Sequence, residues 1–369
     1  MTLIALHFAH EATANCLVAG IPAAARAVHQ VALAAQEGAA IDCCVVAVAG
    51  GWVPSPWCRA ELARLAPSLR VEWTDSDALS AAADVRHFRG EDLLPARTIL
   101  DLSRATTGAR TVFPAQKMML DDMLRELRDK GDAIIAATAK PGDGIVSRYI
   151  NRPVSRLISR AWLRASGVKP IHATIVAAML GLVMALCLFA GGEIGLVIGA
   201  VLFQLASIVD GVDGEIARAT YRSSPRGAML DSMTDAATNL SFFAGLCFNL
   251  WQQGQVYGAA AGAAGLVLLA VGLFLIGRRA HVSGRAFTFD AVKERFGANP
   301  SRLKQWLTWL TMRDFYAAAA AICVVAGFAS QMLMLFAVVA VGWFITSMAV
   351  LGRAGYGHEA AAAGVVDPS

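Results

Sequence analysis

Four stretches of this 369-residue chain contain no Asp, Glu, Lys or Arg: residues 171–192, 194–209, 236–277 and 315–352. A helix that crosses the hydrocarbon core of a bilayer needs about 20 predominantly apolar residues. The second stretch reaches that length only if its helix continues past residue 209. Each of the last two is long enough for two helices joined by a turn. The pattern therefore predicts six transmembrane helices.

The overall composition favours an integral membrane protein. Hydrophobic residues make up 56% of the chain and charged residues only 16%, whereas soluble domains have about 25% charged residues. The composition changes near residue 170, before which charges occur every few residues. We expect a cytoplasmic α/β domain over residues 1–140, a linker with an interfacial helix over 141–168, the six-helix domain over 169–354 and a flexible tail over 355–369.

Lys and Arg gather on one side of the six expected helices. They lie between the second and third helices and in the segment 278–314, while the opposite side has Glu193 and uncharged polar residues. By the positive-inside rule, that segment and both termini face the cytoplasm. The first residues lack a basic segment followed by a full apolar run, so we expect no cleavable signal peptide. We predict a multi-pass protein of the cell inner membrane with a cytoplasm-facing active site.

The cysteines do not indicate a zinc site or a disulfide framework. None is spaced as CxxC, and three lie in apolar stretches; they are Cys16, Cys43, Cys44, Cys58, Cys187, Cys247 and Cys323. We expect them to be small buried hydrophobes.

A basic stripe precedes the first expected span. Arginines recur every four residues, at 148, 152, 156, 160 and 164, and apolar side chains from Val154 to Trp162 fall on the adjoining helical face. Pro153 indicates that the helix begins near Arg152. This pattern predicts an interfacial helix on the anionic cytoplasmic leaflet. The alternative is a soluble amphipathic linker helix.

Charge is concentrated in DGVDGEIARATYRSSPRGAMLDSMTD, residues 210–235. Asp210 and Asp213 lie on one face of a helix with the small Ala217, and Asp231 and Asp235, four residues apart, share a face of the next helix. The segment between them, RATYRSSPR, is expected to be a cytoplasmic turn. The two helices would then form a hairpin on which four carboxylates converge.

Four carboxylates in a small volume repel one another, and ionisable groups near a bilayer are mainly retained for function. A divalent cation removes the repulsion. Ligands that are all oxygens favour Mg²⁺ or Mn²⁺, which in turn bind phosphate oxygens. The alternative is an ion-pair cluster with Arg218, Arg222 and Arg226, but that does not explain Gly214 and Ala217 at fixed offsets, where small side chains admit a close ligand.

At all eight fixed positions, Asp210-x-x-Asp213-Gly214-x-x-Ala217-Arg218-x8-Gly227-x-x-x-Asp231-x-x-x-Asp235 resembles the signature of the CDP-alcohol phosphotransferases. The resemblance covers about residues 145–352. It implies six transmembrane helices, an interfacial helix, a cytoplasm-facing site and Mg²⁺ or Mn²⁺ as cofactor.

Roles follow from the resemblance residue by residue. The metal ligands would be Asp210, Asp213, Asp231 and Asp235, with Asp235 also the general base on the acceptor hydroxyl. The CDP-linked donor would bind at Asp210, Gly214, Ala217, Arg218 and Gly227. A phosphorylated acceptor would be held by Arg278, Arg279, Arg285 or Arg313, although these arginines would equally set the topology.

Two further features bear on the resemblance. The family's Pro-Asn-x-x-Thr cap appears as Pro170-Ile171-His172-Ala173-Thr174, without the asparagine. His172 is a candidate substitute, but an interfacial position is the preferred interpretation. The family also implies a homodimer through the later spans, and the small residues of YGAAAGAAG, 257–265, would permit close helix contact.

The N-terminal region resembles the nucleotidyltransferase domain that is fused to a di-inositol-phosphate-phosphate synthase in one branch of this family. Residues 2–9, 41–51 and 69–73 are predicted strands, and a helix is predicted after Gly20. After the first strand stands HFAHEATANCLVAG, not a glycine-rich loop with an arginine. We therefore expect this domain to be catalytically silent and to act as a scaffold or regulatory part.

These observations favour a membrane transferase that moves a substituted phosphate to a polyol or polyol-phosphate hydroxyl, with release of CMP. CDP-diacylglycerol is the first-choice donor, for phospholipid or head-group synthesis, and a CDP-inositol-type donor with a phosphorylated inositol or lipid acceptor is the alternative. Membrane lipids are expected partners, and nucleic acid is not.

A transporter would show a second broken helix in the other half of the chain. A pseudoenzyme scaffold is disfavoured by the complete aspartate set.

Overall fold

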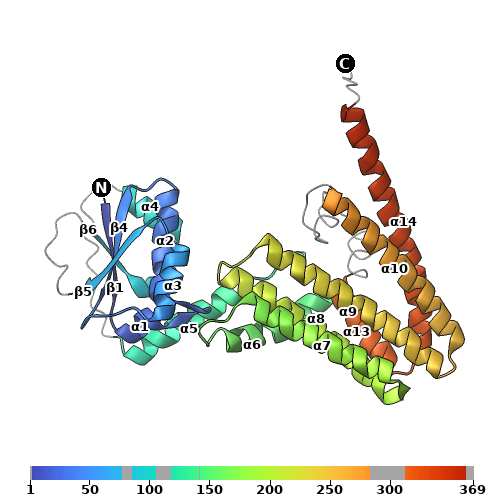
Figure 1. The fold of residues 1–369 in the computed structure, drawn as a ribbon. Helices are drawn as coiled ribbons and strands as arrows, with labels where there is room; N and C mark the ends of the chain where they lie inside the picture. The colour runs from blue at the N-terminus through green and yellow to red at the C-terminus, as the bar shows by residue number, and fades with distance from the viewer. Residues whose placement is uncertain (1, 77–84, 105–117, 141, 283–311, 363–369) are drawn as a thin grey trace. The chain divides into compact units, whose positions relative to one another are not determined.

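The computed structural model describes residues 2–76, 85–104, 118–140, 142–282 and 312–362 (Figure 1). It divides into two compact units. The first comprises residues 1–139, 156–168 and 215–222, and the second comprises residues 140–155, 169–214 and 223–369. The helices α6 and α8 contribute residues to both.

The first unit contains a four-stranded parallel sheet. Its strand order is β5-β4-β1-β6, with β1 (Thr2–Phe8), β4 (Ile41–Val48), β5 (Arg70–Asp75) and β6 (Val85–Arg89). The central strand β1 pairs Ile4 with Cys44 of β4 and with Arg86 of β6. A short hairpin of β2 (Leu17–Val18) and β3 (Ile21–Pro22) lies apart from this sheet.

Helices pack against the sheet or against one another around an apolar core. They are α1 (Glu11–Asn15), α2 (Ala23–Gln36), α3 (Pro56–Leu65), α4 (Ala96–Arg104) and α5 (Leu120–Ala136). Ile4, Phe8, Val28 and Leu127 are almost completely buried in this core. The small N-terminal α/β region predicted from the strand and helix patterns is therefore present. Only Ala9 and His10 separate β1 from α1.

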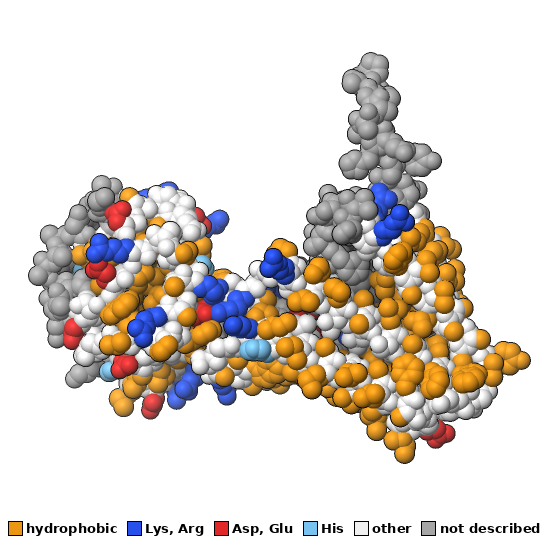
Figure 2. All heavy atoms as spheres, viewed as in Figure 1, with side chains coloured by type: hydrophobic (Ala, Val, Ile, Leu, Met, Phe, Trp, Pro, Cys, Tyr) orange, Lys and Arg blue, Asp and Glu red, His pale blue; other side chains and the backbone are white. Residues whose placement is uncertain are grey.

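The second unit is built mainly from helices. A π-helical turn, Ser147–Asn151, leads into α6 (Arg152–Trp162), followed by α7 (Pro170–Ala190), α8 (Gly192–Ala219), α9 (Pro225–Gln252), α10 (Val256–Val282), α13 (Arg313–Val325) and α14 (Ala329–Ala362). Their large exposed hydrophobic side chains include Met179, Leu182 and Leu186, spaced three and four residues apart on α7. Figure 2 shows apolar side chains spread over the visible face of these helices, as expected for contact with lipid.

The six-span prediction is not confirmed. Among the described residues, four helices are long and apolar enough to cross a membrane: Pro170–Ala190, Gly192–Ala219, Val256–Arg279 and Ala329–Met348. The charge-free stretch after Ala236 does form two helices, but α9 begins eleven residues earlier and includes Arg226, Asp231 and Asp235. In the last stretch, α13 has only 13 described residues.

The helix α6 begins at Arg152, where Pro153 predicted it. Arg152 itself is only 8% exposed, and its Nε donates to Asp143 Oδ2 at 2.8 Å. This arginine therefore does not belong to an exposed basic stripe, whereas Arg148 and Arg164 are exposed. On the same helix Leu157 is 62% exposed. An apolar surface flanked by exposed arginines remains compatible with the interfacial position that we predicted.

Glycines bring α10 and α14 into close contact. A Cβ atom on Gly265 would lie 2.8 Å from Phe336 Cε1 and 3.0 Å from Ala337 Cα, and one on Gly258 would clash with Ser330. The glycines of 257–265 thus pack against a helix of the same chain, whereas Ala260, Ala263 and Ala264 are exposed. Contact between two copies through this segment stays a prediction.

We predict that Gly265→Leu forces α10 away from α14 and costs about 1–3 kcal/mol, the usual cost of overpacking a tight contact. The melting temperature of the purified protein in detergent micelles should fall. The matched control is Gly342→Leu, because a Cβ at that glycine of α14 meets nothing within 4 Å. An equal loss in both variants would contradict the close contact.

Candidate metal and nucleotide site

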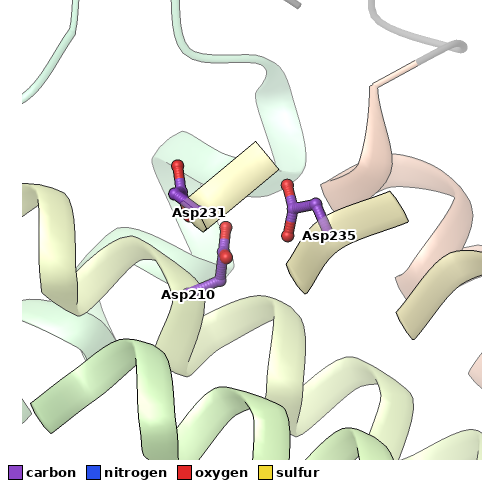
Figure 3. Close-up of side chains that lie close together, drawn as sticks. All are labelled: Asp210, Asp231 and Asp235. Atoms are coloured by element: carbon purple, nitrogen blue, oxygen red, sulfur yellow. The ribbon is translucent and has the colours of Figure 1, made fainter. Parts of the chain in front are cut away.

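Three carboxylates from two helices converge in the second unit. Asp210 lies on α8, and Asp231 and Asp235 lie one turn apart on α9; one ligand oxygen from each lies within 4.8 Å of the others. Figure 3 shows the three side chains directed toward one another. The i, i+4 spacing on α9 places its two aspartates on the face that meets Asp210. The hairpin predicted from the sequence therefore brings these three groups together.

The N-terminus of α9 fixes this spacing. Ser224 caps the helix, since its Oγ accepts a hydrogen bond from Gly227 N at 3.1 Å, and Pro225 occupies the first helical position. Both are common helix-start signals. Gly227, a predicted nucleotide-site residue, thus lies in the first turn of the helix, one turn before Asp231.

The three carboxylates fit a divalent cation. The side-chain Oδ1 of Asp231 is buried and has no hydrogen-bond partner among the described residues, and an unpaired buried acceptor is costly. Carboxylate oxygens are the ligands that Mg²⁺ and Mn²⁺ prefer. A cation held by Asp210, Asp231 and Asp235 would use the unpaired oxygen and offset the repulsion between the three negative charges.

The fourth predicted ligand, Asp213, lies outside this group of three. It is 8% exposed, and its Oδ2 accepts a hydrogen bond from Thr174 Oγ1 at 2.8 Å. Thr174 is the last residue of the cap segment at the start of α7. At the same helix start, Lys169 N donates to His172 Nδ1 at 3.3 Å, so His172 accepts a hydrogen bond from a backbone N–H at the start of α7.

One of the predicted acceptor arginines lies at the carboxylates. Arg313, the first residue of α13, is 10% exposed in its side chain; its Nη1 lies 3.2 Å from Asp210 Oδ1 and forms an ion pair with Asp235. Arg278 and Arg279 lie near the end of α10, and Arg285 lies outside the described residues. The carboxylate group therefore has a cation from a helix that is distant in the sequence.

The predicted nucleotide residues Gly214, Ala217 and Arg218 follow Asp213 on α8. Arg218 donates from Nε to the carbonyl oxygen of Thr138 at 2.8 Å. This bond orients the guanidinium, which the spacing of the signature alone did not predict.

A buried polar network near Asp210 was missed in the sequence. Asn151 donates to Ser207 Oγ at 3.3 Å, and Gln204 donates to Asn151 Oδ1 at 2.9 Å. Gln204 and Ser207, three residues apart in the otherwise apolar stretch 194–209, were the available signal. The network links the start of α6 to α8 one turn before Asp210.

The profile described as CDP-alcohol phosphatidyltransferase matches residues 169–351, the part of the chain that contains all of these acidic residues. This part of the chain belongs to that family. Members of the family are transferases and generally use divalent metal ions. The three carboxylates therefore lie within the part of the chain that matches this family.

Curated relatives carry the name "Bifunctional IPC transferase and DIPP synthase". The protein of Thermococcus kodakarensis is 40% identical over 107 residues, which are 29% of this chain and 23% of the relative. That of Archaeoglobus fulgidus is 32% identical over 158 residues, 42% of this chain and 30% of the relative. That of Rubrobacter xylanophilus is 37% identical over 141 residues, which are 38% of this chain and 31% of the relative. The chain thus spans about a quarter to a third of the length of these relatives.

Mutation of a metal ligand should weaken cation binding before any turnover is measured. We predict that Asp231→Asn lowers the affinity for Mn²⁺, followed by electron paramagnetic resonance, by at least tenfold, because it removes the charge of the only one of the three carboxylates with an unpaired buried oxygen. The control is Asp101→Asn on the exposed surface of α4. Equal affinity in both variants would exclude Asp231 as a ligand.

Proposed function

We propose that the chain transfers a substituted phosphate from a CDP-linked donor to a hydroxyl group, with release of CMP, at the cytoplasmic face of the inner membrane. The observation that carries the proposal is the convergence of Asp210, Asp231 and Asp235 within a complete signature of the family to which residues 169–351 belong.

The bonds and protons balance without a further reactant. The acceptor oxygen forms a bond to the phosphorus of the donor, the bond from that phosphorus to the oxygen of CMP breaks, and CMP leaves. Asp235 accepts the proton of the acceptor hydroxyl as general base. Asp210, Asp231 and Asp235 would hold the Mg²⁺ or Mn²⁺, with Asp213 as the fourth predicted ligand, and the bound ion would withdraw charge from the pyrophosphate oxygens. Gly214, Ala217, Arg218 and Gly227 would bind the nucleotide.

For the donor we favour a CDP-inositol-type molecule over CDP-diacylglycerol. Support comes from the relatives, whose name includes DIPP synthase, and from the α/β region that precedes the helices. This order reverses our preference from the sequence. CDP-diacylglycerol remains the second candidate, since the family's own description is a phosphatidyltransferase.

For the acceptor we favour a phosphorylated polyol. Arg313 is the observation that supports this choice, because it places a buried guanidinium beside Asp235, where the attacking hydroxyl would lie. An arginine binds a phosphate group with two parallel hydrogen bonds. A transporter function is not supported, because the helical part belongs to a transferase family.

The direct test is CMP release by the purified full-length protein with Mg²⁺ or Mn²⁺. The donors are CDP-inositol and CDP-diacylglycerol, and the acceptors are inositol, inositol phosphate and glycerol phosphate. Release of CMP with at least one pair supports the proposal, and the preferred donor decides between the two candidates. No release with any pair would refute it.

We predict that Asp235→Asn lowers kcat about 10²- to 10⁴-fold, the usual contribution of a general base, while the protein remains folded. The rate of CMP release under saturating substrates is the measurement, with Asp101→Asn as the control. A variant with kcat within threefold of the parent would exclude Asp235 as the base.

We also predict that Arg313→Gln raises KM for a phosphorylated acceptor about tenfold or more and leaves KM for the unphosphorylated polyol nearly unchanged. The reason is the loss of one charged partner for the acceptor phosphate, worth about 1.5–3 kcal/mol. Arg278→Gln, at an exposed arginine from the same candidate set, is the matched control. A parallel rise of KM for both acceptors would contradict the assigned role.

A further inference from the structure

The last turn of α8 and the turn that follows it belong to the same compact unit as the N-terminal α/β region. This segment, residues 215–222, contains Ala217 and Arg218 of the nucleotide signature. Four parts of the unit contact it: the helices α2, α3 and α6 and the chain just after α5. Nothing in the chemistry proposed above uses these contacts, although several involve buried charged groups.

Two arginines bind backbone carbonyl oxygens of the last residue of α8 and of the turn that follows it. A helix leaves its last four carbonyl groups without partners inside the helix, and its C-terminus carries a partial negative charge. Arg26 of α2 donates from Nη2 to Ala219 O at 2.7 Å. Arg64 of α3 donates to Thr220 O at 2.9 Å and to Tyr221 O at 3.1 Å. Three consecutive carbonyl groups are thus bound by guanidinium groups that lie about 150 residues or more earlier in the chain.

Arg26 is 2% exposed and is held in place from several sides. It also donates to the carbonyl oxygens of Val18 at 3.1 Å and Ala19 at 3.3 Å, and to the hydroxyl of Tyr221 at 3.2 Å. Burial lowers the pKa of Arg26, and the nearby Tyr221 opposes that change. Burying an arginine is costly unless its N–H donors are hydrogen-bonded. The acceptors around Arg26 therefore offset the cost of removing its guanidinium group from water.

Glu61 of α3 orients Arg64. Its side chain is 2% exposed and accepts from Arg64 Nη2 at 2.6 Å and from Arg222 just beyond the turn. Burial would raise the pKa of Glu61, but the hydrogen bonds from Arg64 and Arg222 outweigh burial and hold the pKa below its usual value. The carboxylate is therefore ionised at neutral pH and fixes both guanidinium groups.

Tyr221 adopts a backbone conformation that a tyrosine rarely takes. Its φ is +53°, in the left-handed region. Outside glycine this conformation persists mainly where the surroundings hold it. One face of α2 does so: His29 packs with its ring 4.5 Å from that of Tyr221, and Gln30 donates to the hydroxyl at 3.3 Å. The turn after α8 is thus shaped by the α/β region.

Arg218 and Glu215 are fixed by the remaining contacts. Arg218 donates to Thr138 O, after α5. Ser159 of α6 donates to Glu215 Oε2 at 2.6 Å, and both side chains are buried. Residues on both sides of Ala217 are therefore bound by the unit.

From these contacts we propose that the α/β region positions the nucleotide-binding end of α8, with Arg26, Glu61 and Arg64 as the positioning residues. The inference rests on the proposed function, since it assigns a role in binding the CDP-linked donor. It gives the region a task that requires no active site of its own. The role is specific: it concerns the donor rather than the acceptor, and residues 215–222 rather than the carboxylates.

The experiment compares Arg64→Gln with the full-length parent. We expect KM for the CDP-linked donor to rise about tenfold, while kcat, the acceptor KM and the Mn²⁺ affinity stay within about twofold. Arg64→Lys, which keeps one charged donor, should recover part of the loss. Arg59→Gln, at an exposed arginine of the same helix, is the matched control and should resemble the parent. A purely structural role would reduce the yield of active protein without changing donor KM.

Two further variants test the same contacts if Arg64→Gln does not fold. Tyr221→Phe removes only the hydroxyl bound by Arg26 and Gln30, and Glu61→Gln removes the charge that fixes Arg64; both should raise donor KM. Unchanged donor KM in all folded variants would overturn the inference while leaving the proposed function intact.

A measurement that needs no turnover separates the two proposals. If the parent releases no CMP, the proposed function fails, and hydrogen–deuterium exchange of the amides of residues 218–222 then tests the contacts alone. Exchange at least tenfold faster in Arg64→Gln than in Arg59→Gln supports the positioning role of Arg64. Equal exchange in the two variants overturns it.

Discussion

Electrostatic repulsion between the aspartates of α8 and α9 is the constraint on which the rest of the helical unit depends. Asp210, Asp231 and Asp235 bring three carboxylates within 4.8 Å, at the end of helices that otherwise suit a hydrocarbon environment. Such an arrangement is stable only with positive charge nearby. The structure supplies one guanidinium, Arg313, and leaves an unpaired oxygen on Asp231 where a divalent cation fits. The Ser224 cap at the start of α9 and the hydrogen bonds at the start of α7 fix the backbone near the aspartates.

Much of this arrangement follows from spacing in the sequence. The offsets between Asp210, Asp213, Asp231 and Asp235 define helical faces, because they match the period of a helix. The charge-free stretches indicate where apolar helices lie. Hydropathy alone did not give the number of spans. The helix α9 includes charged residues in its first turns, and α13 is short, so neither meets the length and composition of a span among the described residues.

Contacts between distant segments could not be predicted in the same way. The hydrogen bond from Thr174 to Asp213 depends on how α7 packs beside α8, and no local pattern specifies that packing. The same holds for Arg26 and Arg64, which no motif in the sequence singles out. Their partners are backbone carbonyl groups at the end of α8 and in the turn after it, and carbonyl groups leave no signal in the sequence. The loss of a glycine-rich loop, by contrast, was visible directly and remains a prediction of catalytic silence.

The position of Arg313 has a consequence for biosynthesis. Asp235 precedes it by 78 residues, so a growing chain exposes the aspartates well before their arginine partner is made. During that interval the negative charges are offset only by water or by cations from solution. Assembly of α8 with α9 is therefore expected to depend on the ionic conditions around the growing chain, and the three carboxylates gain the charge of Arg313 only when α13 has joined them.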